Sequence, residues 1–217
     1  MTPYYQDAWV TIYHGDCREV LPRLGEIGVI VADPPYGISL ETAYRMRGRG
    51  RLAQCVDYPE VTGDDKPFDP AFVLALDVPT VLWGANYFNQ HLPAASGWLV
   101  WDKRCDRMQN DQADGELAWT NFVKGVRIFH HEWNGFRRES EIGESYHPTQ
   151  KPVMLFNWIL TGRWFPAAGV IVDPFYGSGP CLRAAKDLQR HAIGIEIEER
   201  YCEIAAKRCA QEVLALA

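Results

Sequence analysis

Seven short runs of apolar and β-branched residues, separated by helix-length segments, constrain the fold of this chain more than any other feature. Several of these runs are apolar on both faces, which is typical of strands in a parallel sheet that is covered by helices on both sides. The runs occupy residues 10–13, 28–32, 80–83, 98–101, 126–129, 169–172 and 192–195, and the main helical segments occupy residues 151–162, 180–189 and 198–216. We therefore expect an α/β fold with a mostly parallel, seven-stranded, Rossmann-like sheet.

The composition fits one globular unit of 217 residues, with 47% hydrophobic and 23% charged residues. The chain has no run of 18 apolar residues and no basic, apolar leader at its start, so we expect a cytoplasmic protein without a membrane span. The six cysteines form no C-x-x-C pair, and the histidines have no zinc-site spacing, so we expect reduced thiols and no metal. A net charge of −6 argues against binding nucleic acid through bulk charge alone.

In parallel sheets, ligands bind at the carboxyl ends of the strands, so the residues that follow each apolar run are candidates for function. The first such segment is Asp33-Pro34-Pro35-Tyr36. The two prolines fix the backbone and remove two donors, which leaves a rigid corner with a carboxylate, a bare carbonyl and an aromatic plane. Two acceptors beside a ring suit the exocyclic amine of a nucleobase, although a proline strand terminator with a capping aspartate would have the same sequence.

A second candidate is the glycine-rich turn that leads from the sixth run into a helix. Its sequence is Asp173-Pro174-Phe175-Tyr176-Gly177-Ser178-Gly179. Glycines allow close approach of a ligand, and the helix that follows offers unpaired amides and the positive end of its dipole. The turn therefore suits a carboxylate or a phosphate, although a tight strand-to-helix connection alone would explain it.

Glu196 ends the next run, about twenty residues beyond the glycine turn. At this distance a carboxylate can reach the ribose hydroxyls of an adenosine-containing cofactor. The alternative is an acidic residue placed favourably at a helix N-terminus. The glycine turn and the acid together indicate a cofactor site more strongly than either does alone.

These segments resemble those of S-adenosylmethionine-dependent DNA methyltransferases that modify amino groups (N6 of adenine or N4 of cytosine), in the circularly permuted order called the beta group. The resemblance lies in the Asp33 tetrapeptide, the 173–179 turn and Glu196. It extends to Gly15-Asp16 and to His147-Pro148-Thr149-Gln150-Lys151-Pro152. Residues 83–88 and 98–103 resemble phage and prophage members, and Asn86 and Lys103 lie just beyond strand ends, where we expect neighbours of the site.

The resemblance implies roles for individual residues. Residues 1–146 would form a catalytic half, in which Asp33, Pro34, Pro35 and Tyr36 hold the target base, and residues 147–217 a cofactor half within the same domain. The residues expected to bind S-adenosylmethionine are Asp16, Thr149, Lys151, Asp173, Phe175, Gly177, Ser178, Gly179 and Glu196. Lys151 would face the carboxylate of the cofactor.

The implied substrate is DNA, with the target base flipped out of the duplex or already single-stranded. An aspartate at the head of the tetrapeptide favours adenine over cytosine by family association. N4-cytosine methylation stays open, as do a catalytically weakened nucleic-acid-binding module and a methyltransferase that acts on RNA or protein. Asn-Pro-Pro-Tyr would be expected for the protein-modifying class. The expected setting is a bacterial or phage-infected cell, with a role in restriction-modification.

Two features depart from the family pattern. Only about ten residues separate Phe136 from His147, where relatives carry a target-recognition region. Recognition would then be brief or of relaxed specificity, or it would come from the loop at residues 39–69, from a homodimer partner or from an accessory specificity protein. Arg45, Arg47, Arg49 and Arg51 lie in that loop and either contact DNA phosphates or form a solvated segment. In addition, Pro180 replaces the usual threonine after the cofactor turn.

Overall fold

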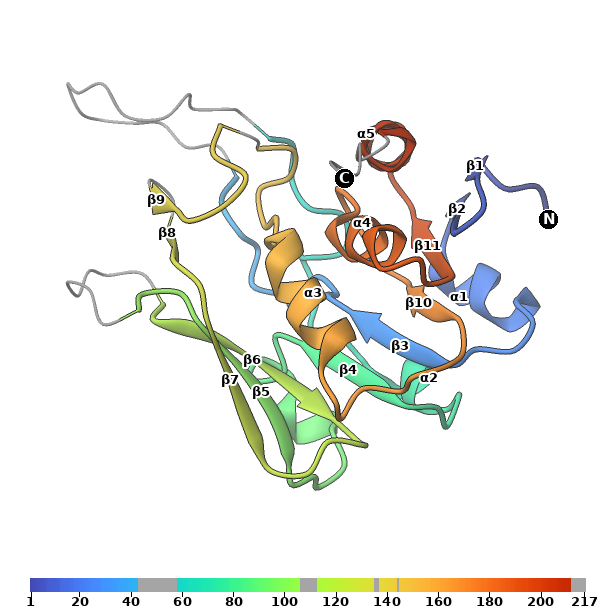
Figure 1. Ribbon diagram of the computed structural model, residues 1–217. Helices are drawn as coiled ribbons and strands as arrows, with labels where there is room; N and C mark the ends of the chain where they lie inside the picture. Colours follow the sequence, from blue (N-terminus) through green and yellow to red (C-terminus); the bar gives the residue numbers. More distant parts are fainter. Residues whose placement is uncertain (43–57, 106–112, 135–136, 144, 212–217) are drawn as a thin grey trace, which may run out of the picture.

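Nine strands form one mixed sheet in the computed structural model (Figure 1), which describes residues 1–42, 58–105, 113–134, 137–143 and 145–211. Within these residues the strand order is β1-β2-β11-β10-β3-β4-β6-β5-β7. The seven predicted strands are confirmed as β2 (Val10–His14), β3 (Val29–Ala32), β4 (Thr80–Trp83), β5 (Gly97–Asp102), β7 (Val126–His130), β10 (Ile171–Asp173) and β11 (Ala192–Glu196). The five central strands from β2 to β4 run parallel, as the apolar pattern predicts.

Two strands of the sheet do not follow from the sequence pattern. β1 (Tyr5–Gln6) pairs antiparallel with β2 at one edge. β6 (Gly115–Thr120) lies antiparallel between β4 and β5. Its first residues, Gly115 and Glu116, have low strand propensity, so the segment lacks the β-branched signature of the other strands. The expected seven-stranded sheet is therefore corrected to nine strands.

Helices cover both faces of the sheet (Figure 1). The apolar sides of α3 (Val153–Thr161), α4 (Pro180–Asp187) and α5 (Glu199–Ala210) pack in one core cluster with inward-facing residues such as Val29 and Val31. The alternate residues Ile30 and Ala32 face the other cluster, which includes α1 (Cys17–Val20) and α2 (Ala71–Leu74). No helix of the described residues has the length and hydrophobicity needed to cross a membrane.

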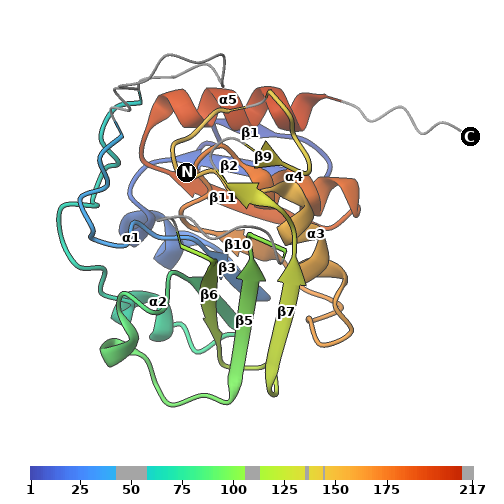
Figure 2. The same cartoon turned by 90° about the vertical axis from the view of Figure 1, so that its left-hand side faces the viewer.

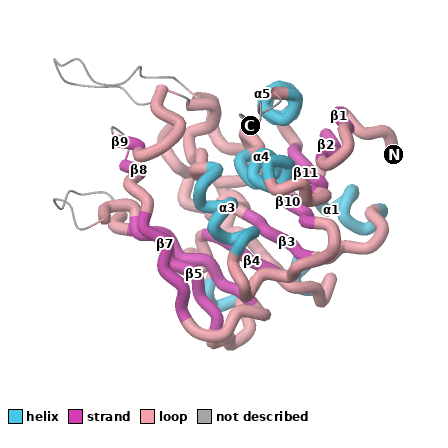
Figure 3. The backbone as a smooth tube through the Cα atoms, in the orientation of Figure 1, coloured by secondary structure: helices cyan, strands magenta, loops and turns pink. Residues whose placement is uncertain are grey.

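The remaining elements are short. The 3₁₀ turns are η1 (Leu21–Arg23) and η2 (Asn89–His91), and β8 (Trp133–Asn134) pairs with β9 (Arg137–Arg138) in a separate two-stranded sheet. Figure 2 shows β5, β6 and β7 side by side at one end of the main sheet. The connection from β9 to α3 is drawn as loop where it is described (Figure 3).

The strand directions place several polar side chains at one edge of the sheet. The carboxyl ends of β2, β3, β4, β10 and β11 meet there because these strands are parallel. β6 runs the opposite way, so its amino end reaches the same edge, with Ala118 opposite Trp83 of β4. Residues that follow the parallel strands and residues that begin β6 therefore face one another.

Candidate active site

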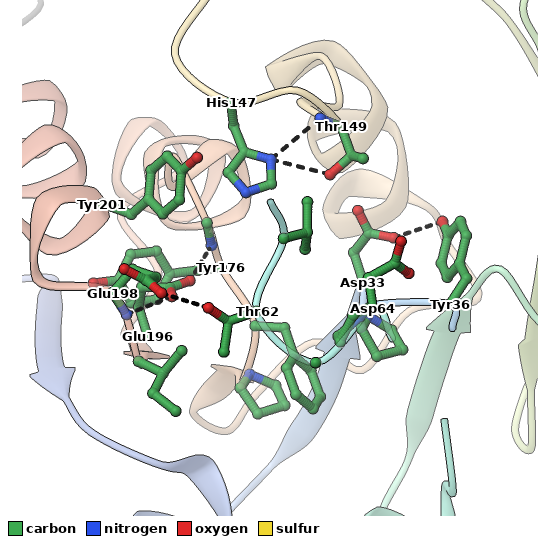
Figure 4. Close-up of a pocket in the computed structure, with 18 of the residues that line it drawn as sticks. Asp33, Tyr36, Thr62, Asp64, His147, Thr149, Tyr176, Glu196, Glu198 and Tyr201 are labelled. Atoms are coloured by element: carbon green, nitrogen blue, oxygen red, sulfur yellow. Dashed lines mark hydrogen bonds between the residues drawn. The ribbon is translucent and has the colours of Figure 1, made fainter. Parts of the chain in front are cut away.

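A cavity of about 460 Å³ opens at this edge of the sheet, a size that suits a small-molecule ligand. It is lined by the predicted catalytic residues Asp33, Pro34, Pro35 and Tyr36, and by the predicted cofactor residues Asp16, Thr149, Lys151, Asp173, Phe175, Gly177, Ser178 and Glu196. Figure 4 shows Asp33 and Tyr36 on one side of the space and Glu196 on the other. The structure thus brings the tetrapeptide and the glycine turn to one cavity.

Asp33 follows β3 directly and is held by two donors on one oxygen. The hydroxyl of Tyr36 donates to Oδ1 of Asp33 at 2.7 Å, and the ammonium of Lys151 lies 2.5 Å from the same oxygen. Among the described residues the polar contacts of this carboxylate all fall on Oδ1, which leaves Oδ2 for another donor. Burial raises the pKa of Asp33, and the nearby Lys151 charge opposes that rise.

Tyr36 is fixed on several sides. Its ring stacks on Tyr87 with centroids 5.0 Å apart and planes 17° apart. Gly84 lies against the same ring, at a distance where a side-chain Cβ could not fit. Tyr87 and Gly84 both come from the loop after β4, so this loop sets the orientation of the tyrosine. Asn86 in the same loop is exposed and does not line the cavity.

Glu116, at the start of β6, is a site residue that the sequence analysis did not identify. Its Oε1 accepts from Lys103 at 2.7 Å, and its Oε2 lies 3.0 Å from the ammonium of Lys151. Burial would raise the pKa of Glu116, but the two ammonium groups outweigh burial and hold it at about 2. The strand-end rule missed this residue because it begins an antiparallel strand.

Lys151 is buried and lies with the tetrapeptide rather than with the glycine turn. Besides Asp33 and Glu116, it contacts the hydroxyl of Tyr36, to which it donates at 2.9 Å. Burial alone would lower its pKa, but the two carboxylates raise it. Two acids of the chain itself thus neutralise the ammonium, and the expected contact of Lys151 with a cofactor carboxylate stays a prediction.

Glu196 and the glycine turn form the other side of the cavity. Glu196 accepts from the backbone N–H of Gly177 at 3.1 Å on Oε2 and from that of Glu198 at 2.8 Å on Oε1. Gly177 has φ of +52°, in the left-handed region. Burial raises the pKa of Glu196, and the backbone donors oppose that rise. The turn and the acid are thus joined in one rigid unit.

Asp173 lies at the base of the same turn and is almost fully buried. Its Oδ1 accepts from the backbone N–H of Phe175 at 3.1 Å. Burial raises the pKa of Asp173 to about 8, despite this hydrogen bond, and the charges of Asp33 and Glu196 add to the rise. In the structure Asp173 thus holds the backbone at the start of the turn.

Four other predicted cofactor residues have structural contacts that the sequence did not specify. Asp16 caps α1 by accepting from the backbone N–H of Arg18 at 2.8 Å. The Phe175 ring meets Phe68 edge to face, with centroids 5.6 Å apart. Ser178 accepts from Arg208. Gly179, with φ of +79°, precedes α4 and lies where a Cβ would meet Ala205 of α5, so it serves helix packing and does not line the cavity.

Thr149 lies beside His147 at the start of the cofactor half. Its backbone N–H and its hydroxyl lie 3.2 Å and 3.0 Å from Nδ1 of His147. The His147 ring also packs on Tyr201, with centroids 4.4 Å apart. Burial lowers the pKa of His147 to about 4, and the charges of Arg200 and Lys151 act in the same direction. The histidine is therefore neutral at pH 7.

Residues 59–69, the last part of the 39–69 loop, line the cavity. Asp64 accepts three backbone N–H groups from the segment after the tetrapeptide, those of Gly37, Ile38 and Leu40. Thr62 donates to Glu198 at 2.5 Å, so the segment reaches the cofactor half (Figure 4). Arg45, Arg47, Arg49 and Arg51 lie outside the described residues.

The fold and the cavity together are typical of proteins that bind a nucleotide-type cofactor beside an acceptor for an amine. A parallel α/β sheet with a glycine turn and an acid one strand later is a nucleotide-type cofactor site. The carboxylate in a rigid proline corner across the same cavity adds an acceptor for an amine. Within the described residues no group of three His, Cys, Asp or Glu side chains is arranged to hold a metal ion.

Comparison with known proteins identifies the family. The family model described as "DNA methylase", for N6 and N4 methyltransferases, matches residues 99–207, half of the chain. The chain belongs to this family of amino-group DNA methyltransferases.

Two curated relatives are bacterial type II methyltransferases. M.HinfI of Haemophilus influenzae is 40% identical over 208 residues, which cover 93% of this chain and 51% of the relative. The chain thus spans about half the length of M.HinfI. M.ScaI of Streptomyces caespitosus is 26% identical over an alignment of 262 positions, which covers 99% of this chain and 86% of the relative.

Two solved structures share the fold. PvuII DNA methyltransferase, described as cytosine-N4-specific, matches with a TM-score of 0.65 and 14% identity, covering 98% of this chain and 90% of that one. The complex of M1.HpyAVI with S-adenosylmethionine matches with a TM-score of 0.55 and 22% identity, covering 92% and 99%. At these identities the comparison shows a common methyltransferase fold.

Proposed function

We propose that this chain transfers a methyl group from S-adenosylmethionine to the N6 amine of adenine in DNA. The observation that carries the proposal is that the Asp33 tetrapeptide and the Gly177–Glu196 unit line one cavity. Adenine is favoured over cytosine because an aspartate leads the tetrapeptide. The tetrapeptide comes before the cofactor turn in the chain, and this supports the permuted order of the beta group, with a catalytic half at 1–146 and a cofactor half at 147–217.

Asp33 and the carbonyl of Pro34 act as acceptors for the two hydrogens of the amine. The nitrogen lone pair of adenine is delocalised into the ring, and holding both hydrogens lets the nitrogen move toward tetrahedral geometry. Oδ2 of Asp33 suits this role, because Oδ1 already accepts from Tyr36 and Lys151. Bound S-adenosylmethionine would supply the methyl group, with the electrons of its carbon–sulfur bond staying on sulfur, and the Asp33 carboxylate or water would then accept one proton from the methylated amine.

Tyr36 and Tyr87 stiffen the pocket for the target base. The stacked pair fixes the plane of Tyr36 beside Asp33, so the aromatic wall does not need to rearrange when a base enters. The target base leaves the stack or comes from single-stranded DNA to reach this corner.

The cofactor residues divide between the two ends of S-adenosylmethionine, which supplies an electrophilic methyl group on its sulfonium. Glu196 accepts from ribose hydroxyls, and Asp16 accepts from the adenine amine of the cofactor. Phe175 packs beside it, Thr149 binds its methionine end, and Gly177 and Ser178 allow its close approach. Asp173 and Gly179 hold the shape of the turn.

The direct test is transfer of labelled methyl from S-adenosylmethionine to unmodified DNA, followed by identification of the modified nucleoside. We expect N6-methyladenine, and its loss in Asp33→Ala with cofactor binding retained. Asp187→Ala is the matched control, because this aspartate pairs with Arg183 at the end of α4, away from the cavity. N4-methylcytosine as the product would overturn the adenine assignment. Absence of both product and cofactor binding would favour a nucleic-acid-binding module of the same fold.

A further inference from the structure

Lys151 is surrounded by three acceptors, one for each hydrogen of its ammonium group. They are Oδ1 of Asp33 at 2.5 Å, Oε2 of Glu116 at 3.0 Å and the hydroxyl of Tyr36 at 2.9 Å. The Lys151 side chain is 3% exposed, so water does not compete strongly for these contacts. The charge of the ammonium is therefore divided between two carboxylates.

The carboxylate of Glu116 in turn forms ion pairs with two lysines. Lys103 holds Oε1 at 2.7 Å and Lys151 holds Oε2, so each carboxylate oxygen meets one ammonium. Lys103 follows β5, Glu116 begins β6 and Lys151 precedes α3, so three elements distant in the sequence fix this chain of charges. Two lysines and two acids leave the group without net charge, which suits a partly buried site.

We propose that Glu116 is a positioning residue that shares the Lys151 ammonium with Asp33, and so keeps the free oxygen of Asp33 a strong acceptor for the target amine. This inference rests on the proposed function and deepens it. Without Glu116, the whole ammonium charge falls on Asp33 and weakens it as an acceptor. Glu116 itself does not touch the substrate and acts through Lys151.

The other groups that face this chain of charges do not replace Glu116. The Tyr36 hydroxyl donates to Asp33 and, at 3.4 Å, toward Oε2 of Glu116, and it accepts from Lys151, so it carries no charge into the group. Asp173 interacts with Asp33, and His147 with Lys151, through long-range electrostatics. Lys151 lowers the pKa of Asp33 and Glu116 raises it, as their opposite charges require.

Two substitutions should shift the pKa of Asp33 in opposite directions. Glu116→Gln keeps the shape and removes the negative charge, so the apparent pKa of Asp33 falls, on the order of one pH unit. Lys103→Met keeps most of the alkyl stem and leaves Glu116 to compete fully for Lys151, so the apparent pKa of Asp33 rises by a similar amount. A merely structural role of Glu116 would not give shifts of opposite sign.

The experiment follows the Asp33 carboxyl carbon by ¹³C NMR during a pH titration of the cofactor-free protein, with the signal assigned by Asp33→Asn. The control is Glu203→Gln, which removes an exposed carboxylate paired with Lys207 on α5 and should leave the Asp33 titration unchanged. In parallel, kcat is measured against pH at saturating DNA and cofactor. For Glu116→Gln we expect kcat to fall about tenfold or more, with its acid limb moved to lower pH and the KM for S-adenosylmethionine within about twofold of the original.

The two proposals fail in different ways. If the NMR titrations shift in opposite directions but no variant or parent protein transfers methyl groups, the proposed function is wrong and the shared ammonium stands. If Asp33 titrates at the same pH in all proteins, or moves the same way in both variants, the positioning role of Glu116 is overturned. Should Glu116→Gln fail to fold, an unchanged Asp33 titration in Lys103→Met would also overturn it.

Discussion

Gly84 lies against the ring of Tyr36 so closely that a Cβ on the glycine would come within 2.5 Å of three ring atoms. The backbone of Gly84 has φ of +72°, where L side chains are strained. Gly84→Ala should therefore displace Tyr36 from Asp33, lower kcat and destabilise the protein by about 1–3 kcal/mol more than strain alone does. Thermal unfolding and methyl transfer measure the two effects.

Gly125→Ala is the matched control for this substitution. Gly125 has a similar φ of +75°, but a Cβ at this position would meet nothing within 4 Å, so the alanine reports the backbone strain without the clash. Equal destabilisation by both alanines, with kcat unaffected in both, would contradict the role assigned to the Gly84 contact.

Glu196→Gln should weaken cofactor binding, and its single oxygen can accept only one of the two backbone N–H groups, of Gly177 and Glu198, that the carboxylate accepts. The amide keeps one oxygen acceptor and the shape of the side chain but loses the charge that strengthens hydrogen bonds to ribose hydroxyls. We expect the Kd for S-adenosylmethionine in calorimetry to rise about 10-fold to 100-fold, as for the loss of one charged hydrogen bond. Glu199→Gln, at an exposed position on α5, should leave the Kd unchanged. An unchanged Kd in Glu196→Gln would remove Glu196 from the cofactor site.

His147 should make the protein sensitive to acid. Its pKa is lowered to about 4 in the folded protein by burial and by the charges of Arg200 and Lys151, against 6.5 for an unperturbed histidine. Between these values the unfolded chain binds more protons, so the stability contributed above pH 6.5 is lost as the pH falls toward 4. Urea unfolding should show a loss on the order of 2 kcal/mol from this residue across the range. His147→Asn should flatten that dependence, and an equally steep fall in the variant would assign it to other groups.

The four arginines at positions 45, 47, 49 and 51 are predicted to contact DNA phosphates. Replacing all four with alanine should weaken DNA binding and reduce the slope of log K against log salt by about 3, because fewer counterions are released. The control replaces four exposed basic residues near the opposite edge of the sheet, namely Arg23, Lys124, Arg127 and Arg163. Unchanged affinity and slope in the 45–51 variant would discard the prediction.

The sequence predicted much of this site because its residues follow parallel strands. Asp33, Asp173 and Glu196 each end or follow an apolar run, and the shared carboxyl edge brings them to one cavity. The rule that site residues follow strand ends did not identify Glu116. β6 runs antiparallel, so its first residues, and not its last, lie at the edge of the sheet where the cavity opens. The pairing of Lys151 with both Asp33 and Glu116 could not be predicted either, since all three residues are far apart in the sequence.

Thr42 and Tyr58 meet through one hydrogen bond, in which the Thr42 hydroxyl donates to the backbone carbonyl of Tyr58 at 2.9 Å. This hydrogen bond holds the backbone at residues 42 and 58 together, and Asp64 secures the neighbouring backbone independently. Segments of different length can be inserted between two residues held together in this way without disturbing the cavity lining that Asp64 secures. The length of chain between Thr42 and Tyr58 can therefore be changed while the backbone that lines the cavity keeps its own hydrogen bonds.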